Sequence, residues 1–255
     1  MDQFIPLTSS LISVGGALVS LAYSRRSARA ERLDAADQLA VRFREPLLHA
    51  VFNLETRLYN IVELGFFARF LTPDSSEEDR EYAVLNTLYV VAQYFCWCEI
   101  LRRDSQFVDP RDDERNCDVI RTLEAVRETF TNSVDERCFR LFRGEQRALG
   151  EVLLVPAVDP HPGAPRWECM GYAAFVRALD DPQTARWFRR LRSDIETLAH
   201  DVQGHDARLR HIQNRLIDIL DILDPDADRI PLDLRKRVNL PAPVHTRYEH
   251  RLPRR

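Results

Sequence analysis

Lysine is almost absent from this sequence, because Lys236 is the only lysine among its 36 basic residues. Such a composition is typical of a GC-rich genome, and it identifies no function by itself. Glycine is also scarce, with 8 in 255 residues. Runs that alternate apolar and polar residues are short, whereas long segments repeat apolar residues at helical spacing. The sequence therefore predicts an all-α protein with one large core or two small ones.

Motifs that carry chemistry are missing as well. The chain has no phosphate-binding G-x-x-x-x-G-K-[ST], no G-x-G-x-x-G, no H-E-x-x-H and no G-x-S-x-G. Its five cysteines have no spacing typical of a disulfide framework, which favours reduced thiols. Asp201 and His205 would share a helix face as metal ligands do, but a polar helix-seam or helix-end residue is the preferred interpretation. We expect no metal and no cofactor.

Charge is missing from residues 4–24, a stretch long enough to span a bilayer. A secretion signal and a buried soluble helix are alternatives, but the start lacks basic residues and no clear cleavage site follows. Four arginines come directly after it, and the positive-inside rule then places the body in the cytoplasm. We predict a single-pass anchor with its basic flank over residues 1–26, with Arg25 and Arg26 at the membrane surface.

Small residues recur at helical spacing within this segment, notably Ser13, Gly16 and Ser20. In lipid, such a stripe lets two helices approach closely. The alternative is that small residues are simply common in weakly apolar anchors. The stripe predicts self-association of the chain in the membrane.

Residues 27–224 are expected to form one helical bundle. An apolar stripe runs through residues 47–71, and residues 82–101 are the most apolar part of the body. We interpret the second segment as a central helix and not as a second span, because Asn86, Gln93 and Glu99 interrupt it. The least regular part follows later, and a minor β element is expected within residues 137–170, for example in the alternating run CFRLFR.

A heptad pattern over residues 184–224 predicts one long helix or a helical hairpin. Gly204 favours the hairpin, whereas the unbroken register slightly favours one helix. The seam predicts coiled-coil packing and a homo-oligomer, with His205 and Leu209 as interface residues, unless it folds back on its own bundle. Its eleven positions are Phe188, Leu191, Ile195, Leu198, Val202, His205, Leu209, Ile212, Leu216, Ile219 and Leu223.

A pocket, if the body has one, is expected near the irregular part of the chain. Its candidate residues are Glu145, Arg147, His161 and Cys169, which supply a carboxylate, a cation, a base and a thiol. Sequence spacing does not bring them together. A buried thiol and surface ion pairs are the preferred interpretation of the same residues.

The last segment, residues 225–255, is rich in proline and arginine and is expected to be a flexible tail. From residue 229 onward, eight basic residues stand against two acidic ones, a net charge of +6, so the first 228 residues carry −10. Arg235, Lys236 and Arg237 are candidates for contact with anionic lipid headgroups. Nucleic acid is a less favoured partner, and a solubilising tail with no partner is an equal alternative.

These observations favour a membrane-tethered cytoplasmic scaffold, adaptor or regulatory protein that self-associates. An enzyme or toxic effector that acts at the inner membrane face, with a site in residues 138–175, is the alternative. A soluble ligand-binding helical protein, whose first helix is internal, is a third option. No residue pattern names a protein partner.

Overall fold

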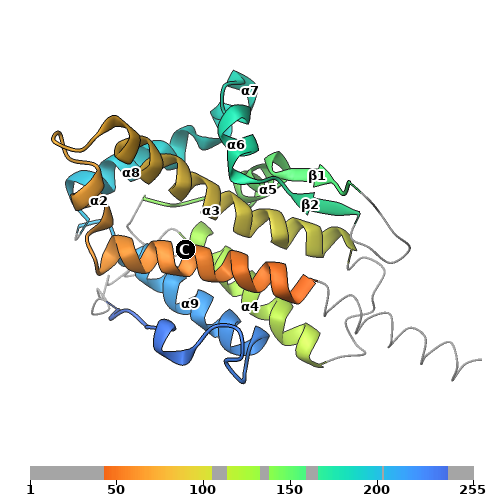
Figure 1. The fold of residues 1–255 in the computed structure, drawn as a ribbon. Coiled ribbons are helices and arrows are strands. Elements are labelled where there is room, and N and C mark those ends of the chain that lie inside the picture. The colour runs from red at the N-terminus through yellow and green to blue at the C-terminus, as the bar shows by residue number, and fades with distance from the viewer. Residues whose placement is uncertain (1–42, 105–113, 133–137, 159–165, 203, 241–255) are drawn as a thin grey trace, which may run out of the picture.

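A computed structural model describes the chain over residues 43–104, 114–132, 138–158, 166–202 and 204–240. This part of the chain is mostly helical, which confirms the predicted all-α class. The predicted anchor and its flank, residues 1–26, lie outside the described residues. In Figure 1, α4 (Glu114–Thr131) and α9 (Ala207–Leu223) lie on one side of the helix formed by residues 43–62, and α3 (Glu77–Asp104) and α5 (Arg143–Val152) lie on the other.

The first described segments form a helical turn-back. The helix over residues 43–62 carries the predicted apolar stripe, and its inward residues are almost fully buried. Gly65 has φ 64°, a conformation that glycine adopts without strain, and it links this helix to α2 (Phe66–Phe70). Ser76 then accepts a hydrogen bond from the Asp79 N–H and begins α3 (Glu77–Asp104), as a capping serine does.

The predicted central helix is α3. It buries most of its apolar residues against the other helices, which confirms its place in the core. Among the described helices, α3 is long and apolar enough to cross a membrane, and 61% of its most apolar window is buried inside the chain. Its polar residues have partners, since Asn86 accepts from Arg57 and Gln93 accepts from Asn53.

Helix α5 (Arg143–Val152) packs very closely on α3. The contact is at Gly150, where an added Cβ would lie 2.6 Å from the backbone oxygen of Phe95. Only glycine permits this approach without a shift of one helix. The close contact fixes α5 and the strand that follows it against the middle of α3.

Helices α4 (Glu114–Thr131) and α9 (Ala207–Leu223) form the second closely packed pair. Arg208, at the start of α9, is buried and donates hydrogen bonds to the backbone oxygens of Thr129, Asn132 and Cys138. A cation is favourable there because the C-terminal end of a helix carries unpaired carbonyl groups and a partial negative charge. Arg208 thereby joins the two helices.

The described β structure is a two-stranded antiparallel sheet of β1 (Leu154–Pro156) and β2 (Trp167–Cys169). Both strands lie within residues 137–170, as the sequence predicts. The run CFRLFR is not one of them. Phe139 there has φ 54°, which ends any extended conformation, and its N–H bonds Asp194 in α8. The alternating pattern instead reflects a turn with several buried side chains.

Residues 184–224 form separate helices. After α6 (Tyr172–Ala178), α7 (Pro182–Ala185) and a 3₁₀ turn (Arg186–Phe188), the chain continues as α8 (Arg189–His200) and α9. The preference for one long helix is wrong. Gly204 marks the break, and its N–H bonds the Asp201 side chain that ends α8. The register survives because both helices bury their apolar faces in the core of the same chain.

Residues 225–240 differ from the flexible tail that the sequence predicts. They turn back along α9 and include a 3₁₀ turn (Leu232–Leu234). Ile230 and Val238 are buried in the core cluster and hold this segment at both ends. The remainder of the predicted tail, residues 241–255, lies outside the described residues.

Candidate functional site

The residues proposed for a pocket engage separate partners. Glu145 closes the first turn of α5, where it accepts the Phe142 N–H at 2.7 Å and pairs with Arg190 at 3.4 Å. Arg147 is half-exposed and pairs with Glu151 at 3.5 Å. Cys169 lies in β2, and His161 lies outside the described residues. Glu145 and Arg147 are therefore each engaged in a separate ion pair at the protein surface, with Arg190 and Glu151.

The buried carboxylate of Glu99, in α3, has three arginines around it. Glu99 is 5% exposed and accepts hydrogen bonds from Arg102 at 2.8 Å and Arg103 at 3.0 Å, with Arg147 3.8 Å away. Burial acts to raise the pKa of Glu99, but the two bonded guanidinium groups outweigh it, and the pKa falls. The cluster is an ion-pair network between α3 and α5, in which each of the three arginines has a carboxylate partner.

The predicted self-association residues fall in two groups. Ser13, Gly16 and Ser20 lie outside the described residues, as do the headgroup candidates Arg25 and Arg26. His205 and Leu209 are described. His205 is half-buried in the turn before α9, and Leu209 is fully buried in the chain's own core. Leu209 thus has no exposed surface to offer a second copy in this fold.

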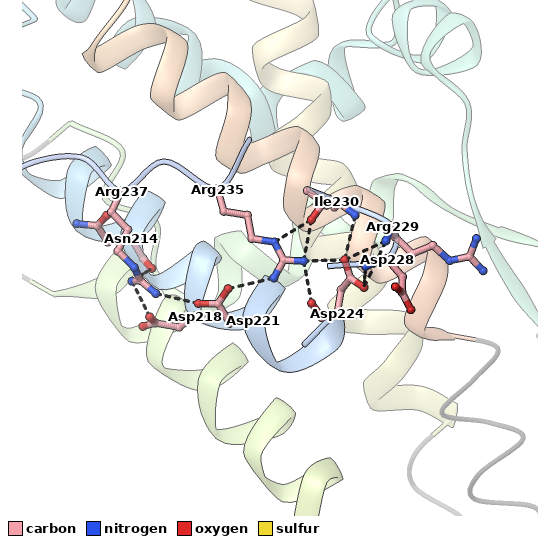
Figure 2. Close-up of polar contacts among 9 residues, drawn as sticks. All are labelled: Asn214, Asp218, Asp221, Asp224, Asp228, Arg229, Ile230, Arg235 and Arg237. Carbon is pink, nitrogen blue, oxygen red and sulfur yellow. Dashed lines mark hydrogen bonds and ion pairs between the residues drawn. The ribbon is translucent and has the colours of Figure 1, made fainter. Parts of the chain in front are cut away.

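The predicted headgroup residues of the tail have different positions (Figure 2). Arg235 is buried and bonds Asp224 at 2.6 Å and Asp221 at 3.1 Å. Arg237 pairs with Asp218 at 2.8 Å and with Asp221 at 3.1 Å. Two of the three charges are thus matched by the acidic face of α9, and the exposed Lys236 side chain is not part of that network.

Asp224 is the centre of this C-terminal network. Its carboxylate accepts the backbone N–H groups of Asp228, Arg229 and Ile230, which closes the loop after α9 (Figure 2). Burial acts to raise its pKa, but the Ile230 and Arg229 N–H groups and the Arg235 cation outweigh that, so the pKa is lowered. Arg235 and Asp224 are a fully bonded buried pair whose role is structural.

A second buried arginine has a different environment. Arg57, near the end of the helix over residues 43–62, is 8% exposed. Its Nη2 donates to the Asn86 side chain and lies 3.5 Å from the Tyr82 hydroxyl, both neutral groups. Its guanidinium carbon lies 4.0 Å from the centre of the Phe66 ring. Its Nη1 is buried and has no hydrogen-bond partner.

The electrostatics at Arg57 agree with this geometry. Burial lowers its pKa, and the nearby hydroxyls of Tyr82 and Tyr172 offset only part of that effect. A guanidinium nevertheless stays charged at any physiological pH. The site formed by Arg57, Phe66, Tyr82, Asn86 and Tyr172, here called the Arg57 cage, therefore contains one buried positive charge that no carboxylate of the described residues pairs with.

Sequence reasoning missed Arg57, although a signal exists. It follows Leu54 by three positions and precedes Ile61 by four, so it lies on the buried face of the helix. Glu55 is a second charged residue at a buried position. It is 1% exposed and accepts a hydrogen bond from Gln213 at 2.7 Å. Burial raises its pKa to about 7, with the bonds from Gln213 and Thr56 opposing.

Three comparisons with known proteins give no relative from which a function could be transferred. No family model matches the chain, and no curated protein and no solved structure matches it either. Within the described residues, no group of three or more His, Cys, Asp or Glu side chains could hold a metal ion. The Arg57 cage is the candidate functional site that the geometry of the described residues supports best.

Proposed function

We propose that this chain is a membrane-tethered helical adaptor, held at the membrane by residues 4–24 with its body in the cytoplasm. The observation that carries the proposal is the uncharged stretch of 21 residues followed directly by arginines. Arg25 and Arg26 would contact anionic headgroups, and each such charge contributes about 1 kcal/mol of attraction near the surface.

The described body supports an adaptor role more than a catalytic one. Glu145 and Arg147, the charged residues of the alternative pocket, are engaged in ion pairs with neighbouring side chains. In the described clusters around Glu99 and Asp224, these two carboxylates are bonded to neighbouring arginines. A rigid bundle with a tether fits a protein that presents a surface to a partner at the membrane.

Self-association is proposed to run through the anchor. Most of the heptad residues from Phe188 to Leu223 are used in the chain's own core, so they offer no free seam. The stripe of Ser13, Gly16 and Ser20 remains, and in lipid it would work by close backbone approach.

The stripe is tested by placing a large side chain on it and, separately, beside it. Gly16→Leu should dissociate the chain in detergent micelles, because the leucine would hold two helices apart. Ala22→Leu is the matched control, since it also puts leucine in place of a small residue but lies two positions from Ser20, on another face of a helix. Equal dissociation by both variants, or by neither, would contradict the role of the stripe.

The tether is tested by deletion of residues 2–24. The full chain should sediment with membranes and resist washing with high salt. The deleted chain should be recovered in the soluble fraction with its helical body still folded, as verified by circular dichroism. A full chain released by high salt would refute the tether. A reporter that works only in the cytoplasm, fused after Arg255, should be active, and an inactive fusion of a membrane-bound chain would reverse the proposed orientation.

A further inference from the structure

The Arg57 cage holds a charge that the fold does not neutralise. A buried ion carries a desolvation penalty of several kcal/mol, which folding tolerates when a counter-ion or a full set of hydrogen bonds compensates. Arg57 has a neutral amide, a distant hydroxyl and an aromatic face. A cation–π contact offsets only part of that penalty. One strong donor, Nη1, remains unused.

The other buried arginines of the described residues show what full compensation looks like. Arg208 donates to the backbone oxygens of Thr129 and Asn132 at the end of α4 and to that of Cys138. Arg235 bonds two carboxylates and the Ile230 oxygen. Arg57 is as buried as these two, yet its one close hydrogen bond is to a neutral amide and its Nη1 has no acceptor. An anion would supply both the missing acceptor and a counter-charge.

The exposed Tyr82 side chain of the cage is held to Arg57 by a long contact, which a ligand would replace. Tyr82 is 49% exposed, and its hydroxyl contacts Nη2 at 3.5 Å, the limit of a hydrogen bond. Rotation of this side chain would break this long contact and a ring contact 5.6 Å from the guanidinium carbon, and would free Nη2 for another acceptor. Phe66 and Tyr172 are half-buried beside it, and Tyr172 is backed by the Tyr89 ring at 5.4 Å.

We propose that the Arg57 cage binds a small organic carboxylate with an apolar or aromatic body. The carboxylate accepts a hydrogen bond from Nη1 and replaces the Tyr82 hydroxyl at Nη2, so that the guanidinium makes a two-point contact. The apolar body packs between Phe66, Tyr82 and Tyr172. One buried positive charge balances a monoanion, whereas a phosphate dianion would leave a buried negative charge in excess.

This proposal goes beyond the adaptor function and does not depend on the tether. The probe is 4-fluorobenzoate, and binding is measured by ¹⁹F line broadening on the full chain in a neutral detergent. The neutral isostere 4-fluorobenzamide tests whether the charge is recognised, and inorganic phosphate in competition tests the ligand class. Arg57→Met removes the cation. Arg69→Met, at an exposed arginine of the neighbouring α2, is the matched control.

The expected result is saturable binding of 4-fluorobenzoate to the wild type and to Arg69→Met. Binding should weaken by about 10- to 100-fold in Arg57→Met, as expected for the loss of a charged hydrogen bond. Arg57→Lys keeps the positive charge but loses the paired N–H donors of the guanidinium. Its affinity for 4-fluorobenzoate should lie between those of the wild type and Arg57→Met. Helix content from circular dichroism verifies that each variant is folded.

Three results would overturn the proposal. The first is no saturable broadening with the wild type at millimolar 4-fluorobenzoate. The second is equal binding by the benzamide or by both methionine variants, because the cation would then not be recognised. The third is displacement by phosphate at equal or lower concentration, because the site would then prefer a dianion. None of these results bears on the tether, which is tested by fractionation.

Discussion

Arg57 and Arg235 are two buried arginines of one molecule, and their surroundings differ completely. The side chain of Arg235, from residues 225–240, lies against the end of α9 and is bonded to Asp224, Asp221 and the Ile230 backbone oxygen. Arg57 lies between the helix over residues 43–62 and α3, against an aromatic ring and a neutral amide. Burial alone therefore does not tell what an arginine does. The two arginines differ in their bonded partners, since Arg235 has carboxylates and a backbone oxygen whereas Arg57 has a neutral amide and an Nη1 without an acceptor.

Glu55 sharpens the comparison, because it lies two positions before Arg57 in the same helix and is also buried without a counter-ion. A carboxyl group can escape that penalty by binding a proton, and burial accordingly raises the pKa of Glu55 to about 7. A guanidinium has no such escape. Of the two residues, only Arg57 must keep its buried charge at neutral pH.

The largest effect is expected at the matched pair. Arg235→Met leaves Asp224 buried without its cation and removes the bonds from Arg235 to Asp224 and to the Ile230 oxygen. The free energy of unfolding should fall by about 3–5 kcal/mol, measured by urea titration followed by circular dichroism. A loss below about 1 kcal/mol would mean that the pair contributes as little as a surface ion pair and would remove the contrast with Arg57.

A smaller and pH-dependent effect is expected at Glu55. Because its pKa is raised from 4.5 to about 7 in the folded chain, the folded state binds the proton more tightly than the unfolded state. Its contribution to stability is fully present below pH 4.5 and is lost as the pH rises through about 7. The Glu55→Gln variant cannot ionise. It should gain up to about 3 kcal/mol over the wild type above about pH 7 and nothing near about pH 4.

The measurement for Glu55 is a pair of urea titrations at each pH for the wild type and Glu55→Gln. The difference between the two isolates this residue from others that titrate in the same range, such as Asp194, whose pKa burial raises to about 6. A difference that does not change between about pH 4 and pH 8 would show that Glu55 titrates normally.

Arg237 provides the small-effect control for Arg235. It binds the same acidic face of α9, but its side chain is half-exposed and its ion pairs face water. Exposed pairs contribute between 0 and about 1 kcal/mol. Arg237→Met should therefore change the free energy of unfolding by less than about 1 kcal/mol in the same titration. A loss as large as that of Arg235→Met would assign the stabilisation to the whole segment instead of the buried pair.

The helices could be predicted from the sequence because each depends on local spacing. Residues 47–71 carry an apolar stripe and residues 82–101 are the most apolar part of the body, and neither pattern requires knowledge of its partners. Gly204 signalled the break between α8 and α9. The heptad register misled for a physical reason. Two helices that each bury one face in a common core reproduce the same three-four spacing as one long seam.

The polar sites were harder to predict because they depend on contacts between distant segments. Asp218, Asp221 and Asp224 recur every three residues and form one acidic face, but their pairing with Arg235 and Arg237 requires the chain to reverse after Pro225. Arg57 stands among apolar residues in the sequence. Its lack of a counter-ion appears only when Asn86, Tyr82 and Phe66 are in place around it.

The most direct test of whether Arg57 is retained for binding and not for folding is the stability of Arg57→Met without ligand. Methionine fills much of the same space, removes the unmatched buried charge and leaves only the neutral Asn86 amide to be resolvated. The free energy of unfolding should be higher than that of the wild type, or lower by no more than about 1 kcal/mol. A loss of about 3 kcal/mol or more, comparable to that of Arg235→Met, would contradict this and make Arg57 a structural residue.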